Sequence, residues 1–275
     1  MSQLGPSPQR LFSCTPSKLT AFDCPRRYRF SYVDRPPPAK GPAWAHNTVG
    51  AAVHVALARW YSTLVPAHRT TEAGEILVEA AWQDEGFRDA EQSARWRERA
   101  AGWVRSYLAG VDPRREPIGV ERTVGTATAT LAISGRVDRI DDRGDELVIV
   151  DYKTGRTESS EDEARGSLAL ALYVLAARRT LRRPVRRVEL HHLPSGTVAG
   201  YDHTDESLAR HLARAESTAA DIVVATDTLA AGADPDDVFP PVPSALCSWC
   251  DFRAACPEGQ AASSPLDSWA GLREN

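Results

Sequence analysis

The chain has 275 residues, 42% of them hydrophobic, and a formal net charge of −4. This length and apolar content can fill a substantial core, and the negative charge excludes a uniformly basic nucleic-acid-binding protein without excluding a local positive groove. No apolar run approaches the roughly 20 residues that a bilayer span requires, and no signal-peptide pattern is present, so we expect a soluble, cytoplasmic protein without membrane contact.

Helical patterns occupy the first part of the chain. A proline-rich connector at 34–42 precedes Val49, Val53 and Leu57, which recur at helical spacing, and residues 72–110 continue with helical patterns. We therefore predict a helical part at about 43–115.

Strand patterns follow this helical part. Ala129, Leu131 and Ile133 alternate along one face, which predicts a strand, and the continuous apolar run at 146–153 predicts a second strand in the middle of a sheet. The later expected elements are a helix, a strand and a helix, at 167–179, 186–193 and 205–226. This order predicts an α/β fold in which a mixed sheet, at about 118–200, is flanked by helices.

Two aspartates are expected to face each other across the hairpin that these two strands form. With Gly144 and Asp145 as a two-residue turn, the register sets Asp138 opposite Asp151. Directly opposed side chains have Cβ atoms about 4.5 to 5.5 Å apart, so the two charges repel. Mg²⁺ or Mn²⁺ among the oxygens would remove that repulsion. The alternative is a pair of splayed, solvated strand ends with Lys153 as a surface salt-bridge partner.

Lys153 lies on the same face as Asp151, because side chains alternate along a strand. The chain has only three lysines and carries its other positive side chains as arginine, so a lysine here is unusual. Near two acids and a metal ion, a compact ammonium would orient an attacking water and stabilise charge on a phosphate.

The segment GRVDRIDDRGDELVIVDYKTG, at 135–155, resembles the core of the PD-(D/E)XK nuclease superfamily, and in particular its RecB-like exonuclease branch. In that branch a Gly-x-x-Asp strand is followed by Asp-x-Lys and then Thr-Gly. The resemblance implies a restriction-endonuclease-like core with a helical insertion. It also implies that Asp138 and Asp151 bind metal together with the Tyr152 carbonyl, and that Lys153 is the catalytic lysine.

The resemblance to this family extends to other positions. The family places a histidine early on a helix, and GAAVHVALARWY supplies His54, which becomes an expected metal ligand. Of its Gln-x-x-x-Tyr motif, Tyr173 is present as an expected catalytic residue, but Ala169 stands where glutamine is expected. This departure leaves open a slow or unusually specific enzyme. Glu121 lies near a position where relatives often carry an acid, and it receives a supporting role only.

Five cysteines without a secretory signal favour metal binding or free thiols over a disulfide framework. Cys247, Cys250 and Cys256 supply three thiolates at C-x2-C-x5-C spacing, and a tetrahedral metal ion or a four-iron cluster needs a fourth. Cys24 and Cys14 are the upstream candidates. From spacing alone, zinc and an iron–sulfur cluster both remain open.

The cysteine pattern also resembles the iron–sulfur variant of this branch, which occurs in bacterial helicase-nucleases and CRISPR-associated exonucleases. That resemblance selects Cys24, which is followed by proline and basic residues, and implies a [4Fe-4S] cluster held by Cys24 and the three carboxy-terminal cysteines. The cluster would form a clasp between 13–30 and 240–258. It would also cross-link distant parts of the chain.

The expected protein is a single nuclease domain over residues 1–275: a metal-dependent, single-strand DNA exonuclease of DNA repair, recombination or CRISPR adaptation. Arg26, Arg27 and Arg29 are expected to line a DNA channel, with a solvated arginine-rich face as the alternative. Besides DNA, a helicase or a CRISPR-adaptation protein is an expected partner. The alternative function is a catalytically weak DNA-binding or scaffolding subunit of a helicase–nuclease complex. A third hypothesis is a zinc-stabilised protein of unrelated function.

Overall fold

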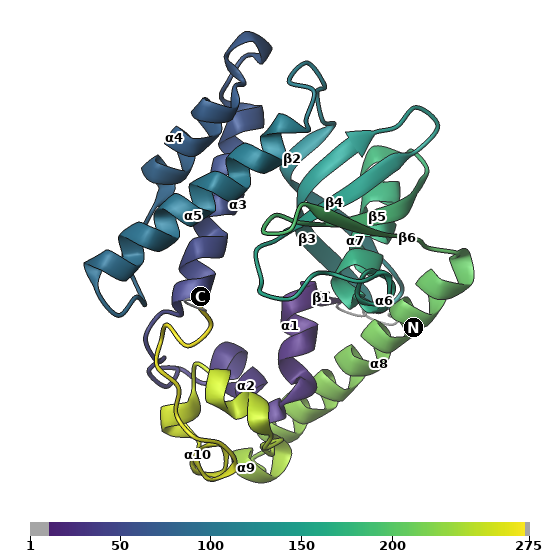
Figure 1. Cartoon of the computed structure of the whole chain (residues 1–275). Helices are drawn as coiled ribbons and strands as arrows, with labels where there is room; N and C mark the ends of the chain where they lie inside the picture. Colours follow the sequence, from purple (N-terminus) through teal and green to yellow (C-terminus); the bar gives the residue numbers. More distant parts are fainter. Residues whose placement is uncertain (1–10, 273–275) are drawn as a thin grey trace, which may run out of the picture.

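The computed structural model describes residues 11–272 of the chain. Its strands are β1 (Phe12–Cys14), β2 (Gly119–Ala127), β3 (Leu131–Asp142), β4 (Leu147–Lys153), β5 (Val185–His192) and β6 (Thr197–Asp202). They form one sheet in the order β1-β3-β4-β5-β6, with β2 also paired to β3. Parallel pairs, β1–β3 and β4–β5, occur beside antiparallel ones, so the sheet is mixed. The predicted fold class is confirmed (Figure 1).

Ten α-helices are found within the described residues: α1 (Pro16–Thr20), α2 (Pro25–Tyr28), α3 (Ala45–Ser62), α4 (Thr71–Ala81), α5 (Ala90–Ala109), α6 (Glu161–Gly166), α7 (Leu168–Leu181), α8 (Asp205–Ala230), α9 (Pro235–Val238) and α10 (Pro257–Ala262). Several begin at a side chain that accepts a hydrogen bond from a free backbone N–H of the first turn. These N-caps are Thr70, Asp89, Ser160, Ser167 and Thr204.

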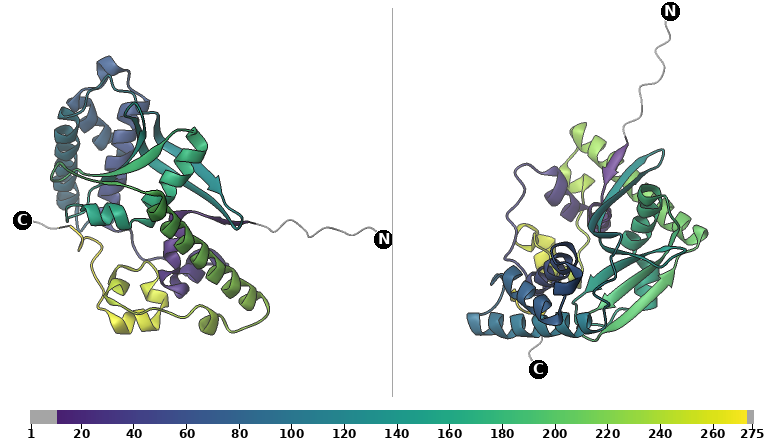
Figure 2. Two further views of the ribbon diagram at one scale, coloured as in Figure 1. Left: turned by 90° about the vertical axis from the view of Figure 1, so that its right-hand side faces the viewer. Right: turned by 90° about the horizontal axis from the view of Figure 1, so that it is seen from above.

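Different helices cover the two faces of the sheet. Side chains alternate along β4, so neighbouring residues of this strand contact different helices. Val148, Val150 and Tyr152 pack against α3 and α5. Leu147 and Ile149 lie on the other face and pack against α7. Figure 1 and Figure 2 show α3, α4 and α5 as one group beside the sheet. Both faces of β4 are therefore apolar, as predicted for a central strand.

One edge of β3 is shared by two strands. β1 pairs with it at Leu131 to Ile133, and β4 pairs with it at Arg139 to Asp142. Among the described residues, no strand pairs with 134–138 on that edge. The sheet is therefore open just where Asp138 lies, and side chains from outside the sheet can enter.

The amino- and carboxy-terminal segments lie side by side, with α2 in purple and α10 in yellow in Figure 1. The Arg26 N–H donates to the Pro240 carbonyl at 3.3 Å, and the rings of Phe30 and Phe252 are 5.6 Å apart. Between the predicted cysteines the chain forms only short helical turns, η4 (Ala245–Trp249) and η5 (Arg253–Ala255).

Most of the predicted elements are present, and three strands were missed. The helices predicted around Val49, at 167–179 and at 205–226 correspond to α3, α7 and α8. The strands β1, β2 and β6 were not predicted, and Ala129 lies in the turn between β2 and β3 instead of on a strand. The ends of the predicted domain, 1–10 and 273–275, lie outside the described residues. In the part of the chain that is described, no helix has the length and apolar character to span a bilayer.

Candidate active site

Three carboxylates lie in one row across neighbouring strands. The pairing of Arg139 with Val150 confirms the predicted hairpin register and sets Asp138 opposite Asp151. The register between β2 and β3 sets Glu121 opposite Asp138 on the other side. Each of the three adjacent strands therefore contributes one acid at the same level of the sheet.

Glu121 is held in an unusual backbone conformation. Its φ angle is 47°, in the left-handed region that a side chain with a Cβ atom rarely adopts. Its carboxylate is 2.7 Å from the Arg136 guanidinium. Burial raises the pKa of Glu121, and the charge of Asp138 adds to this while Arg136 opposes it. Strain of this kind collects at functional sites, where the surrounding structure maintains it.

His54 extends from α3 to the opening between the strands. Its Nδ1 is 3.3 Å from Asp138 Oδ2, and its Nε2 is 3.1 Å from the Tyr152 carbonyl oxygen. A carbonyl and a carboxylate only accept, so without an ion this arrangement favours the protonated imidazole, which would release a proton on binding a metal ion. Burial alone would lower the pKa of His54, but hydrogen bonding to Asp138 and the nearby acids raise it. The helix approaches this closely because Gly50, one turn earlier, has no Cβ to crowd Thr154.

Asp138 also closes the opening between β3 and β4. Where the two strands separate, the Tyr152 N–H has no ladder partner on β3 and donates to Asp138 Oδ2 at 2.9 Å instead. The same oxygen faces His54. Asp138 is therefore fixed through Oδ2 by backbone and side chain together, and no residue at 11–272 forms a hydrogen bond with its Oδ1.

Lys153 and Asp151 form an ion pair on the same face of β4, with Nζ and Oδ2 2.7 Å apart. Burial raises the pKa of Asp151, the charge of Asp138 adds to the rise, and Lys153 opposes it. For Lys153, burial lowers the pKa, but the charge and hydrogen bond of Asp151 raise it overall. The ammonium is thus charged at neutral pH and donates to Asp151.

Tyr173, on α7, covers the open edge of β3. A Cβ at Gly135 would overlap with its ring, which explains why the strand has glycine three residues before Asp138. Burial raises the pKa of Tyr173, and the charges of Asp151 and Asp138 add to this effect. Ala169 lies one turn before Tyr173 on the same helix, so the position where relatives carry glutamine faces the same side.

A cleft of about 970 Å³ contains most of these groups. It is lined by His54, Glu121, Asp138, Lys153 and Tyr173, and by the start of α1 at Thr15 to Ser17. The predicted site residues other than the cysteines and arginines therefore meet in one place. Asp151 borders it through Lys153.

The group best placed to hold a metal ion differs in one member from the predicted set. Within the described residues, His54, Glu121 and Asp138 are the one group whose ligand atoms all lie within 4.8 Å of one another. Sequence reasoning gave Glu121 a supporting role only. The signal that could have found it is a second hairpin, turning at Thr128–Thr130, whose register pairs Glu121 with Asp138. Asp151, predicted as a ligand, is engaged by Lys153.

Four cysteines line a second, small cavity between the terminal segments: Cys24, Cys247, Cys250 and Cys256. Backbone N–H groups of Val242, Ser244 and Gly259 donate to three of the sulfurs at 3.4 to 3.5 Å. Among the described residues, no three of these thiols have sulfurs mutually within 4.8 Å. Cys14, the competing candidate, is buried in β1 among apolar side chains. The geometry therefore groups Cys24, and not Cys14, with the carboxy-terminal cysteines.

The three arginines expected to contact DNA are engaged within the protein. Arg26 is buried and pairs with Glu258 at 3.0 Å, and Arg29 is buried and pairs with Asp236 at 2.7 Å. Arg27 donates to two backbone carbonyls of the preceding turn. The arrangement does not favour a DNA channel at Arg26 and Arg29, because their guanidinium groups are desolvated and neutralised by acids that join the two terminal segments.

Carboxylates in a row on a mixed sheet, with a histidine and a lysine beside them, define the site of a metal-dependent phosphodiesterase. The sequence pattern of the PD-(D/E)XK nuclease superfamily matches residues 13–257. The chain belongs to this superfamily.

Two solved structures are weakly similar to this chain. A "Putative exonuclease" from Eubacterium rectale is 9% identical, with a TM-score of 0.32 over 62% of this chain and 81% of that chain. The protein SSO0001 is 16% identical, with a TM-score of 0.34 over 77% of this chain and 85% of that chain. Both TM-scores are below 0.5, so the family assignment rests on the sequence pattern. No curated protein matches the chain.

Proposed function

We propose that this protein is a cytoplasmic, metal-dependent exonuclease that hydrolyses single-stranded DNA in repair, recombination or CRISPR adaptation, as one catalytic domain of the RecB-like branch. The observation that carries the proposal is the row of Glu121, Asp138 and Asp151 beside Lys153. Such crowding of like charges destabilises a sheet unless a cation offsets it. A helicase or a CRISPR-adaptation protein would be its partner.

The side chains would divide the work as follows. His54, Glu121 and Asp138 would hold the ion, with Asp151 and the Tyr152 carbonyl completing its shell. Bound Mg²⁺ or Mn²⁺ would lower the pKa of a water molecule and neutralise the scissile phosphate. Lys153, held by Asp151, would donate to the water or to the phosphate oxygen where charge develops. Tyr173 would close the cleft from α7.

The test is cleavage of end-labelled single-stranded DNA with Mn²⁺, compared between the unmodified protein and Lys153→Ala. We expect products from the former and a rate at least ~100-fold lower from the latter, the usual scale for losing one electrostatic donor. Equal rates would remove the lysine from the mechanism. Products of one nucleotide at early times would support exonuclease action, and internal fragments would contradict it.

A second function, a catalytically weak DNA-binding or scaffolding subunit, is favoured by one observation. Ala169 stands where relatives carry glutamine, one turn from Tyr173, and its side chain cannot position DNA or water. The same assay separates the two functions, since binding without cleavage at any Mn²⁺ concentration would support the scaffold.

We further propose that the four cysteines hold a [4Fe-4S] cluster as a clasp between the terminal segments. A single zinc ion with Zn–S distances of ~2.3 Å requires sulfurs about 3.8 Å apart. Among the described residues no three of these sulfurs lie mutually within 4.8 Å, so the thiols as they stand do not form a zinc site, and in a cluster each thiolate would bind a separate iron. The N–H groups that donate to the sulfurs would stabilise the charged cluster.

Anaerobic determination of iron, zinc and sulfide, together with the absorption spectrum, tests this clasp. We expect about four iron atoms and four sulfides per chain, the composition of one [4Fe-4S] cluster. Cys250→Ser should remove the visible absorption and lower solubility, whereas Cys14→Ser should retain the colour. One zinc ion per chain without sulfide would identify the alternative.

A further inference from the structure

A third cavity, of about 610 Å³, adjoins the catalytic cleft. The two share His46, Thr154 and Gly155 in their walls, so they are neighbours. Thr154 and Gly155 directly follow Lys153 on the chain, and Arg156 comes next. Three residues span at most about 11 Å, so this wall of the cavity lies within about 11 Å of the Lys153 backbone.

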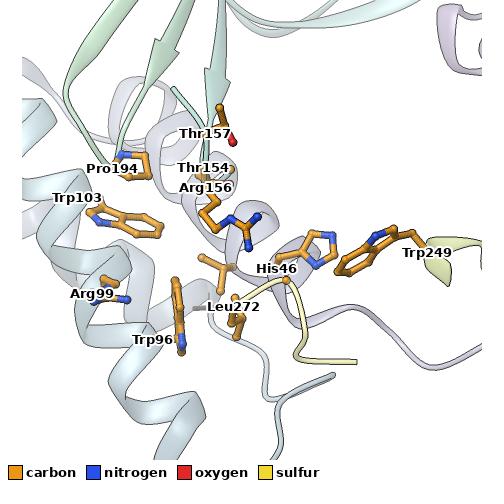
Figure 3. A pocket seen from close by; sticks show the side chains of 13 residues that line it. His46, Trp96, Arg99, Trp103, Thr154, Arg156, Thr157, Pro194, Trp249 and Leu272 are labelled. Carbon is orange, nitrogen blue, oxygen red and sulfur yellow. The ribbon is translucent and has the colours of Figure 1, made fainter. Parts of the chain in front are cut away.

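The walls of this cavity are aromatic. Trp96 and Trp103 come from α5, and Trp249 and His46 come from η4 and α3, on the opposite wall in Figure 3. Trp96 and Trp103 have ring centroids 6.0 Å apart, and those of His46 and Trp249 are 5.4 Å apart. Trp249 is 37% exposed although it is a large ring. We refer to this cavity as the aromatic pocket.

The indole N–H groups in the aromatic pocket differ from those elsewhere. Trp44, Trp60 and Trp82 donate to acceptors in the protein at 3.2, 2.9 and 2.9 Å. For Trp96, Trp103 and Trp249, none of the residues at 11–272 supplies an acceptor. Buried or half-buried indoles usually have such a partner, so these rings offer both a stacking face and a donor to a ligand.

Among the described residues, the lining of the aromatic pocket carries two arginines, Arg99 and Arg156. Arg156 extends into it between the two walls (Figure 3), and no carboxylate of the described residues lies within ion-pair distance of it. Arg99 stacks on Trp96 at 4.9 Å. Of the residues at 11–272, no Asp or Glu lines the pocket, in a chain with 37 acidic residues. The catalytic cleft, in contrast, is lined by acids.

We propose that the aromatic pocket binds an unpaired nucleobase of the strand whose phosphate lies at Lys153, and that Arg156 contacts the backbone of that nucleotide. Aromatic faces with arginines and no acids suit a base with its phosphate, and they tolerate any sequence because every base stacks. A paired base cannot enter, so the pocket selects single strands. This inference rests on the proposed function, because it takes the catalytic cleft to hold DNA.

The experiment measures binding of a fluorescent 12-mer of thymidine, and of an abasic 12-mer with the same phosphates, without added divalent metal so that no cleavage occurs. We expect Trp249→Ala to weaken binding of the thymidine strand by about 5- to 150-fold, the effect of losing one base stack. Trp249→Phe should restore most of it. On the abasic strand, the unmodified protein and Trp249→Ala should bind equally.

Arg156→Ala should act differently, since it removes a phosphate contact. It should lower the slope of log K against log salt by about 0.7 on both strands. Two matched controls lie nearby. Leu246→Ala removes an exposed side chain from the Trp249 turn, and Arg97→Ala removes an exposed charge from the Trp96 helix. Both should bind as the unmodified protein does.

Equal loss of binding to both strands in Trp249→Ala would overturn the proposal, since the ring would then act on the fold. Unchanged binding in that variant would also overturn it. Adding Mn²⁺ to the same samples tests the proposed function separately. Base-dependent binding that requires Trp249, without cleavage, would remove the nuclease activity and retain the pocket.

Discussion

Charged side chains on the two faces of β3 and β4 differ in the number and burial of their partners. On the face toward α3 and α5, Arg139 is buried and donates to the hydroxyls of Tyr61, Tyr107 and Tyr152 at 3.0, 2.9 and 2.8 Å. It also pairs with Asp141 at 2.8 Å. One charge is thus surrounded by partners that the protein itself supplies.

This network continues into β5. The Tyr107 hydroxyl is 2.8 Å from His191 Nδ1, and His191 Nε2 is 3.1 Å from Glu189. Glu189 in turn accepts from Arg187 at 2.8 Å and from Arg143 at 3.1 Å. Each charged side chain of this network therefore contacts partners that can donate to it or accept from it.

On the other face the charged partners are fewer and more exposed. Glu121, Asp138 and Asp151 lie side by side, and each has one cationic neighbour: Arg136, His54 and Lys153, respectively. The side chains of these neighbours are 71%, 30% and 39% exposed, whereas Arg139 is buried. We call the Arg139 face the compensated face, because its charges have several partners each; on the other face, a bound cation would complete the crowded acids.

The largest effect is expected when one of the crowded acids is changed, and it concerns catalysis. Asp138→Asn keeps the shape of the side chain but removes the charge that the ion requires, so we expect cleavage with Mn²⁺ to fall at least ~100- to 1,000-fold. The free energy of unfolding without metal should stay the same or rise, because a repulsion is lost. Rates and urea denaturation measured together check this, and a large loss of stability would place Asp138 in the structural network instead.

The second effect concerns the compensated face. Arg139→Met leaves the buried Asp141 with only the longer contact to Arg143, at 3.5 Å, so the free energy of unfolding should fall by about 3 to 5 kcal/mol. Arg139→Met combined with Asp141→Leu should recover a substantial part of this, since no isolated charge remains. Urea denaturation of both variants provides the measurement. If the double variant were as unstable as the single one, the loss would come from the tyrosines and not from the charge.

The sequence could predict the part of the site that depends on one local turn. Gly144 and Asp145 fix the β3–β4 register, and that register alone brings Asp138 and Asp151 together. Glu121 needs a second hairpin and a left-handed backbone conformation, and neither has a glycine signal. A pattern of period two does not reveal such a position.

Long-range pairing limited the remaining predictions. The partners of Arg139 come from three elements besides its own strand, so no spacing in the sequence connects them. Arg26 and Arg29 look like a basic cluster, but besides Asp34 their acidic partners are more than 200 residues away, at Asp236 and Glu258. The aromatic pocket likewise combines α5 with a turn near the carboxy terminus. Tertiary structure supplies these partners.

A third, smaller effect sharpens the assignment of the metal ligands. At a Mn²⁺ concentration 100 times the dissociation constant, binding to the folded state should raise the free energy of unfolding by about 2.7 kcal/mol. Glu121→Gln should reduce this gain at the same Mn²⁺ concentration, because a ligand of the closest group is weakened. Glu163→Gln, an acid that faces Lys153 from α6, is the control and should retain the gain. Equal gains in all three proteins would exclude Glu121 from the metal site.

The smallest effect is a pH dependence that belongs to the compensated face. The hydrogen bond from His191, followed by contacts with Arg187 and Arg143, lowers the pKa of Glu189 from 4.5 to about 2. A lowered carboxyl pKa stabilises the fold fully above the ordinary pKa, and the stabilisation is lost as the pH falls toward the folded-state pKa. Allowing for the partial exposure of both arginines, we expect Glu189→Gln to reduce the free energy of unfolding by roughly 2 kcal/mol at neutral pH. Between about pH 5 and pH 2 the unmodified protein should therefore lose this much more stability than Glu189→Gln. Urea denaturation across that range measures this difference in the free energy of unfolding. If stability fell equally with pH in both proteins, the neighbours of Glu189 would not stabilise its charged form. The two faces of the sheet would then differ less than their contacts indicate.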